Sequence, residues 1–253
     1  MLKANIEAGL KALHLSLMKE VYQPLAIRAM TEAVPYEQYL YWLIEQEQES
    51  RRVKRIERRL EESKLPRSKT LESFDTRRLS QNLARQIQGL ATGDFIKQKE
   101  NLLIFGSPGS GKTHLLAAVG QSLVRSKDMR IQFLPCNRLL QELLLAKKNL
   151  QLTKVLKKMV SYDGIILDDI GYVQQTQEEV EVLFTLISEC YEKTSLLITS
   201  NLPFSKWNQI FKDSMMTTAA IDRLVHHSVI LEMNVQSYRM EKAKKKREEE
   251  KTE

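Results

Sequence analysis

The sequence predicts an α/β fold in which a parallel sheet is covered by helices on both faces, preceded by a separate helical segment. From residue 101 onward, short apolar runs alternate with stretches of helical length, as buried strands and their covering helices do. The first apolar run leads directly into a glycine-rich loop and a further helical stretch. The first 100 residues show helical patterns instead, so they need a separate structural explanation.

The chain before the first apolar run predicts a small all-helical domain. We expect helices over 2–18, 36–60 and 76–90, with a linker over 65–74. Pro35 opens the second of these helices and Pro66 ends it. The predicted division is an N-terminal helical domain over 1–70, an α/β domain over 71–238, and a charged, disordered tail over 239–253.

Strands and helices alternate in order through the α/β domain. The expected strands are 102–105, 130–134, 164–167, 195–199 and 229–233. The expected helices are 112–125, 136–160, 177–192, 204–212 and 217–226. Short buried strands separated by helices are typical of parallel sheets.

The bulk composition favours a polyanionic partner and a reducing compartment. The net charge is +7, and part of the excess lies in a basic block, residues 51–69, and in a lysine cluster, residues 147–158. Each cluster could also be an ordinary solvated helix face. Cys136 and Cys190 are isolated and are interpreted as free thiols. With no apolar run of about 18 residues and no signal-peptide core, we expect a soluble cytoplasmic protein with no membrane partner.

The glycine-rich loop fits the phosphate-binding pattern G-x-x-x-x-G-K-[ST] at every fixed position. Its residues are Gly106, Ser107, Pro108, Gly109, Ser110, Gly111, Lys112 and Thr113. Between a strand and a helix, such a loop turns backbone N–H groups onto a β-phosphate. Lys112 then reaches the β- and γ-phosphates and the Thr113 hydroxyl can bind Mg²⁺. Nucleotide binding is the function that the residues themselves indicate.

Polar side chains follow the next two central strands. Asp168 and Asp169 end one strand and Asn201 follows another. At the carboxyl end of its strand, Asp168 can hold Mg²⁺ opposite the phosphates, while Asp169 can orient the attacking water or accept its proton. Asn201 can hydrogen-bond the γ-phosphate or that water without competing for the metal. Alone, the acids could mark a strand end, and Asn201 could cap a helix before Pro203.

Arg223 is the candidate for a further catalytic cation. An exposed arginine can neutralise charge on the γ-phosphate bound by a neighbouring subunit. A local ion pair between Asp222 and Arg223 is the alternative interpretation.

Four segments in this order, GSPGSGKT, ILDDIG, LLITSN and AAIDRLVHH, resemble the AAA+ ATPases, and within them the bacterial helicase loaders and the IstB-like transposition helpers. The segments LKALHLSLM, YEQYLYWLIEQEQESRRVKRIERRL, TLESFD and LVHHSVILEMNVQSYR resemble the IstB-like family. The resemblance covers residues 2–238. It implies an AAA+ P-loop core whose Walker B acids are Asp168 and Asp169, whose sensor 1 is Asn201 and whose arginine finger is Arg223. Because few residues follow the last strand, we expect no full C-terminal lid, and Arg239 stands in for sensor 2.

The resemblance also implies what the protein does. ATP with Mg²⁺ binds between subunits, the chains self-associate into a ring or helical filament on non-specific duplex DNA, and the assembly recruits the cognate transposase, which stimulates hydrolysis. The DNA-contact candidates are Lys147, Lys148, Lys154, Lys157, Lys158, Arg51, Arg52 and Arg55. A replicative helicase loader is the alternative within the same clade. A nucleotide-gated adaptor with negligible turnover is an alternative of a different class.

Overall fold

The structure is a computed structural model that describes residues 1–171, 175–235, 237 and 238. The chain divides into two compact units, Met1–Arg58 and Arg59–Glu253, and the long helix α3 (Tyr36–Ser63) runs through the division. The described parts contain no helix that is both long and apolar enough to cross a membrane.

The first unit consists of α1 (Leu2–Ala12), α2 (Ser16–Thr31) and α3 as far as Arg58. A carboxylate joins two of these helices: Glu47 of α3 accepts hydrogen bonds from the N–H groups of Leu17 and Met18 in the first turn of α2. Free N–H groups at a helix start favour such an anion. The unit has little core, because Leu43 and Ile56 are its only apolar residues classed as buried.

The expected helix over 2–18 is two helices in the structure. The chain turns after α1 with His14 at φ 55°, where the N–H of His14 bonds the Lys11 carbonyl and the N–H of Leu15 bonds the Leu10 carbonyl. This hydrogen-bond pair is a Schellman motif, which normally places glycine at the left-handed position. Because histidine stands there in place of glycine, no stop signal is visible in the sequence, and α2 was not expected as a separate helix.

The second unit is built on a five-stranded parallel sheet, and the α/β expectation is confirmed. The strand order is β2-β3-β4-β1-β5. The strands are β1 (Asn101–Gly106), β2 (Ile131–Pro135), β3 (Gly164–Ile170), β4 (Ser195–Ser200) and β5 (Ser228–Met233). All carboxyl ends therefore lie on one edge, with β1 beside β4 and β4 beside β3.

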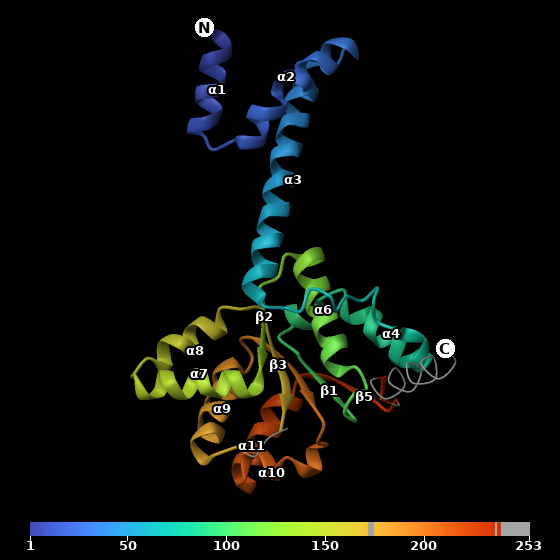
Figure 1. Cartoon of the computed structure of the whole chain (residues 1–253), viewed down its shortest axis with the longest axis vertical. Coiled ribbons are helices and arrows are strands. Elements are labelled where there is room, and N and C mark those ends of the chain that lie inside the picture. Colours follow the sequence, from blue (N-terminus) through green and yellow to red (C-terminus); the bar gives the residue numbers. More distant parts are fainter. Residues whose placement is uncertain (172–174, 236, 239–253) are drawn as a thin grey trace, which may run out of the picture. The chain divides into compact units, whose positions relative to one another are not determined.

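Helices cover both faces of this sheet (Figure 1). One face is covered by α7 (Cys136–Lys148), α8 (Leu152–Val160), α9 (Gln177–Cys190), α10 (Asn208–Phe211) and α11 (Ser214–Val225). The other face is covered by α4 (Gln81–Leu90), α5 (Asp94–Lys97) and α6 (Lys112–Lys127). Successive side chains of a strand point to opposite faces of the sheet. Leu103 of β1 belongs to the core on the α9 side, whereas Ile166 of β3 points toward Gly120 of α6 on the other face.

Two further expectations about helices differ from the structure. The stretch 136–160 is not one helix, because Leu150 at φ 56° closes a second Schellman turn between α7 and α8. The stretch 76–90 begins with a short 3₁₀ helix, η1 (Thr76–Arg78), before α4. A second 3₁₀ helix, η2 (Phe204–Lys206), precedes α10.

Candidate functional site

The loop between β1 and α6 has the conformation that a phosphate-binding loop requires. Gly111 has φ 100°, a left-handed conformation that side chains with a Cβ rarely adopt. Gly106 lies so close to β5 that a Cβ there would be 2.6 Å from the Met233 carbonyl oxygen. Glycine is therefore needed at both positions for reasons of backbone geometry, and the loop leads into the N-terminus of α6, where N–H groups favour an anion.

Lys112 lies at the centre of this loop and is buried. Its Nζ donates to the carbonyl oxygens of Gly106 at 2.7 Å and Ser107 at 3.1 Å, and to the amide oxygen of Asn201. Oxygens of neutral groups are thus among the partners of the ammonium group. Phosphate oxygens carry negative charge and make stronger hydrogen bonds to it, so a bound nucleotide can replace these partners.

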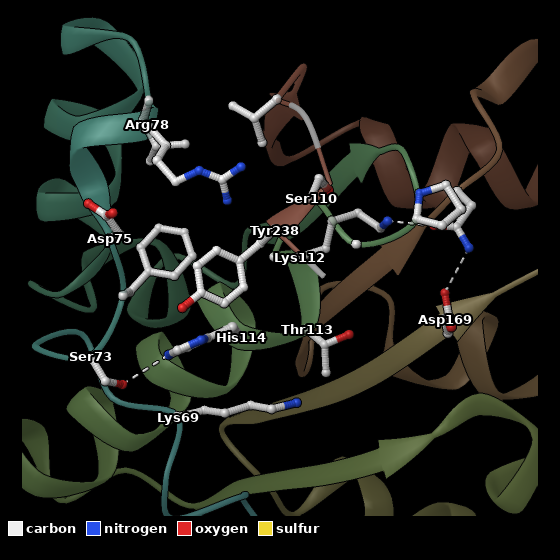
Figure 2. Close-up of a pocket in the computed structure, with 17 residues that line it drawn as sticks. Lys69, Ser73, Asp75, Arg78, Ser110, Lys112, Thr113, His114, Asp169 and Tyr238 are labelled. Carbon is white, nitrogen blue, oxygen red and sulfur yellow. Dashed lines mark hydrogen bonds between the residues drawn. The ribbon is translucent and has the colours of Figure 1, made fainter. Parts of the chain in front are cut away.

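Asn201 connects the lysine to the acidic strand. Its Nδ2 donates to Oδ1 of Asp169 at 3.1 Å, as the dashed line from Asp169 in Figure 2 shows. Asp169 is at φ 69°, unusual for a residue other than glycine, and the β3–β4 register shifts between Leu167 and Ile170. Left-handed backbone at a non-glycine residue costs on the order of 1 kcal/mol or more, so surrounding contacts must stabilise it here.

Thr199 of β4 holds both acids and was not singled out from the sequence. Its hydroxyl donates to Oδ1 of Asp168 at 2.8 Å and accepts from the N–H of Asp169 at 2.7 Å. The residue is fully buried. One side chain therefore positions one carboxylate and stabilises the unusual backbone that carries the other.

These groups line a cavity of about 380 Å³, a volume in the range of ligand pockets (Figure 2). Its lining residues include Lys112, Thr113, Asp169 and Asn201. Asp168 does not line the cavity and is connected to the site by its hydrogen bond with Thr199. The opposite wall comes from residues that sequence reasoning missed, and these are Lys69, Ser73, Phe74, Asp75, Arg78, His114 and Tyr238.

The segment expected to be a linker, 65–74, is thus part of the site. It is attached to α6: Nε2 of Gln121 donates to the carbonyl oxygens of Pro66 at 2.8 Å and Lys69 at 2.7 Å. Nε2 of His114 lies 3.0 Å from the Ser73 hydroxyl. Figure 2 draws this hydrogen bond as a dashed line. The His114 imidazole makes an edge-to-face contact with Phe74 at 5.3 Å between ring centroids. In the sequence, the resemblance of the segment TLESFD to the IstB-like family was the signal that could have indicated this wall.

The electrostatics of this wall favour a neutral imidazole. Partial burial lowers the pKa of His114, and the Lys69 charge lowers it further, against the raising effect of the Thr70 carbonyl. On the other side, the Arg78 guanidinium lies 5.2 Å from the centre of the Tyr238 ring, and the Tyr238 N–H bonds the Gly109 carbonyl at 3.0 Å. The end of the described chain therefore rests on the phosphate loop.

Arg223 does not line this cavity. Its carbonyl and that of Leu224 face the Asn101 side chain, which lies at the start of β1. The phosphate loop follows the other end of that six-residue strand, on the order of 15–20 Å away at about 3.3 Å per residue. The guanidinium lies 5.2 Å from the Phe184 ring centre and donates to the Ala219 carbonyl.

The DNA-contact candidates are divided between the two units. In the second unit, Lys147 and Lys148 end α7, and Lys154, Lys157 and Lys158 lie on α8, all exposed. Lys147 pairs with Glu181 at 2.9 Å. In the first unit, the exposed residues Arg51, Arg52 and Arg55 lie on α3. Arg51 forms an ion pair along the helix with Glu47, and Arg52 forms one with Glu49. Arg239 lies outside the described residues.

Comparison with known proteins gives the family. The profile of the family described as IstB-like ATP binding protein matches residues 8–247. The chain belongs to this family. An insertion sequence ATP-binding protein of Sinorhizobium fredii is 42% identical over 242 residues, covering 95% of this chain and 81% of the relative. The insertion sequence IS21 ATP-binding protein of Pseudomonas aeruginosa is 36% identical, covering 95% and 91%.

A solved structure supports the fold in particular. The DnaC helicase loader matches with a TM-score of 0.56 at 22% identity, covering 67% of this chain and 97% of that one. This likeness confirms an AAA+ fold for the second unit and says nothing further about function. The chain is thus an IstB-like ATP-binding protein, and its fold is of the AAA+ type.

Proposed function

We propose that this protein is an ATP-hydrolysing helper of an insertion-sequence transposase that assembles on duplex DNA in its ATP-bound state. The supporting comparison is the family, whose relatives are described as insertion sequence ATP-binding proteins. The single observation that carries the mechanism is the position of Arg223, which lies at the sheet edge opposite the phosphate loop.

The first step is binding of the triphosphate. The N–H groups of the loop and the Lys112 ammonium bind the phosphates, and the aromatic wall of Phe74, His114 and Tyr238 offers ring surfaces to the base. The Thr113 hydroxyl and the Asp168 carboxylate are hard oxygen donors of the kind that Mg²⁺ prefers, so they would hold the ion. When bound, Mg²⁺ would neutralise charge on the phosphates.

The second step is attack by water. Asp169 and Asn201 are hydrogen-bonded to each other and line the cavity, so together they can orient a water molecule toward the γ-phosphate. Once phosphate oxygens replace the Asn201 amide oxygen as acceptors for the Lys112 ammonium, that amide oxygen is available to accept a hydrogen bond from the water.

The third step requires a second copy of the chain. Because Arg223 lies far from the phosphate loop of its own subunit, its proposed role as an arginine finger would be toward the nucleotide of a neighbour arranged head to tail. A nucleotide that contacts two subunits favours the associated state, so ATP promotes assembly and hydrolysis reverses it.

The exposed lysines of α7 and α8 are the proposed contacts to duplex DNA. Lysines that bind phosphates do not distinguish sequences, and their affinity falls with salt. Changing Lys154, Lys157 and Lys158 together to Glu should abolish binding and leave DNA-independent turnover intact. Loss of that turnover as well would indicate misfolding, and unchanged binding would show that DNA is held elsewhere.

The coupling between ATP and assembly is tested with Lys112→Ala. This variant should lose ATP-promoted assembly on duplex DNA, measured by light scattering or electron microscopy, while Lys97→Ala at an exposed lysine of α5 should assemble normally. ATP-promoted assembly of Lys112→Ala would refute the coupling.

Comparing duplex with single-stranded DNA separates the transposition helper from a helicase loader. Phosphate release in the presence of DNA separates the transposition helper from an adaptor without turnover.

A further inference from the structure

Three metal-ligating side chains converge at the amino edge of the sheet, away from the phosphate loop. They are Glu192, in the turn between α9 and β4, and His226 and His227, which follow α11. One ligand atom from each residue lies within 4.8 Å of the other two, and all three residues are exposed. Nothing in the proposed ATPase mechanism uses this cluster.

The backbones that carry these side chains are fixed. The His227 carbonyl accepts a hydrogen bond from the N–H of Asn101 at 2.7 Å, which attaches it to the start of β1. The His226 N–H bonds the Asp222 carbonyl at 3.0 Å. The turn containing Glu192 is closed by two bonds from the N–H groups of residues 193 and 194 to the Cys190 carbonyl. Metal binding would therefore require side-chain rotation only, and exposed side chains can rotate at little cost.

A second group orients one of the ligands. The Tyr191 hydroxyl lies 3.0 Å from Nδ1 of His226, and the two rings lie 6.2 Å apart. Metal-binding histidines usually have their other nitrogen fixed by such a partner.

We propose that Glu192, His226 and His227 form a binding site for a divalent transition metal of the Zn²⁺ or Co²⁺ class. Two imidazoles and one carboxylate are a donor set that these ions favour, and they leave a fourth tetrahedral position open. Metal–ligand bonds of about 2.0–2.1 Å place the ligand atoms of a tetrahedral site about 3.3 Å apart. The three ligand atoms, which lie within 4.8 Å of one another, would therefore move somewhat closer together on binding. The Cys190 thiol, two residues before Glu192, is buried and does not belong to this group of three ligand atoms.

The bound ion would connect two parts of the fold that are distant in sequence. It would fasten the end of α11, the helix that carries Arg223, to the turn after α9. This part of the inference, a link to the arginine finger, rests on the proposed function, whereas metal binding itself does not.

The test uses the full chain, free of nucleotide and with any polyhistidine tag removed. Titration with Co²⁺ should give the visible absorption of a tetrahedral site at one ion per chain, without the intense bands of a cobalt–thiolate bond. His226→Ala and His227→Ala should each weaken binding by about 100-fold or more, and Tyr191→Phe by about 10-fold. The matched control, Glu189→Gln on the neighbouring turn of α9, should bind normally.

A second readout separates a lost ligand from a lost fold. Zn²⁺ at about 100 times its dissociation constant should raise the melting temperature of the wild-type chain by a few degrees, and should not raise that of His227→Ala. Without metal, the wild-type and His227→Ala chains should have the same melting temperature. The proposal would be overturned if Co²⁺ gave no stoichiometric spectrum or gave the bands of a cobalt–thiolate bond. Binding that survived both histidine substitutions would also overturn it. None of these results depends on ATP hydrolysis.

Discussion

The hydroxyl of Thr199 provides the sharpest test of how the site is held together. Replacing Thr199 with Val keeps the shape of a fully buried side chain and removes one oxygen. That oxygen donates to the Asp168 carboxylate and accepts from the N–H of Asp169, whose backbone is left-handed. The substitution therefore removes two hydrogen bonds without creating a cavity.

The expected magnitude follows from these two contacts. A hydrogen bond to a charged group contributes about 1.5–3 kcal/mol, and the lost acceptor for a largely buried N–H costs about 1 kcal/mol more. We expect Thr199→Val to lower the free energy of unfolding by about 3 kcal/mol. Because it also displaces Asp168 and Asp169, turnover should fall by about 10²-fold, the typical cost of displacing catalytic groups by about 1 Å. Affinity for ATP should change little, since the loop and Lys112 are untouched.

Three measurements decide this prediction: urea unfolding, Mg-ATP turnover and binding of a fluorescent ATP analogue. Thr199→Ser, which retains the hydroxyl, is the matched control and should keep most of the turnover. If Thr199→Val turned over ATP within about threefold of the wild type, Thr199 would be a packing residue and the positioning role would be wrong.

Three further outcomes are expected. Arg223→Ala should bind ATP normally and lose about 10³-fold in turnover, measured by phosphate release; normal turnover would make Arg223 a surface residue. Phe74→Ala should weaken ATP binding by about 10-fold through loss of an aromatic contact, measured by calorimetry, and an unchanged affinity would place the base elsewhere. The lowered pKa of His114 means that the unfolded chain takes up a proton first as pH falls. His114 therefore stabilises the fold above pH 6.5, and this stabilisation is lost as pH falls from 6.5 through the lowered pKa. A His114→Gln chain should lack this loss in urea unfolding across that range.

Much of the α/β unit could be predicted from the sequence because its signals are local. The strands are short apolar runs in the interior of a sheet, and the phosphate loop has fixed glycines for backbone reasons that hold in any such fold. The polar residues after β3 and β4 could be placed near the loop because parallel strands end on the same edge. In the structure, Asp169, Asn201 and Lys112 do form one hydrogen-bonded chain.

The features that could not be predicted depend on contacts between distant residues. The breaks after α1 and α7 are Schellman turns that carry His14 and Leu150 where glycine would have been a visible signal. Residues 65–74 have no periodic pattern, so their place in the wall of the cavity follows from contacts with Gln121 and His114. The convergence of Glu192 with His226 arises from packing of α9 against α11 and leaves no trace in sequence spacing.

The distance between Arg223 and the phosphate loop of the same chain has a genetic consequence. In the proposed head-to-tail assembly, a chain with Lys112→Ala would inactivate the site that it carries, whereas a chain with Arg223→Ala would inactivate the site of its neighbour. Two inactive alleles expressed together would then complement each other within the assembly. With random head-to-tail mixing in equal amounts, about one quarter of the sites would combine an intact loop with an intact arginine. Either allele would also be partly dominant over the wild type, which a protein acting as a monomer would not show.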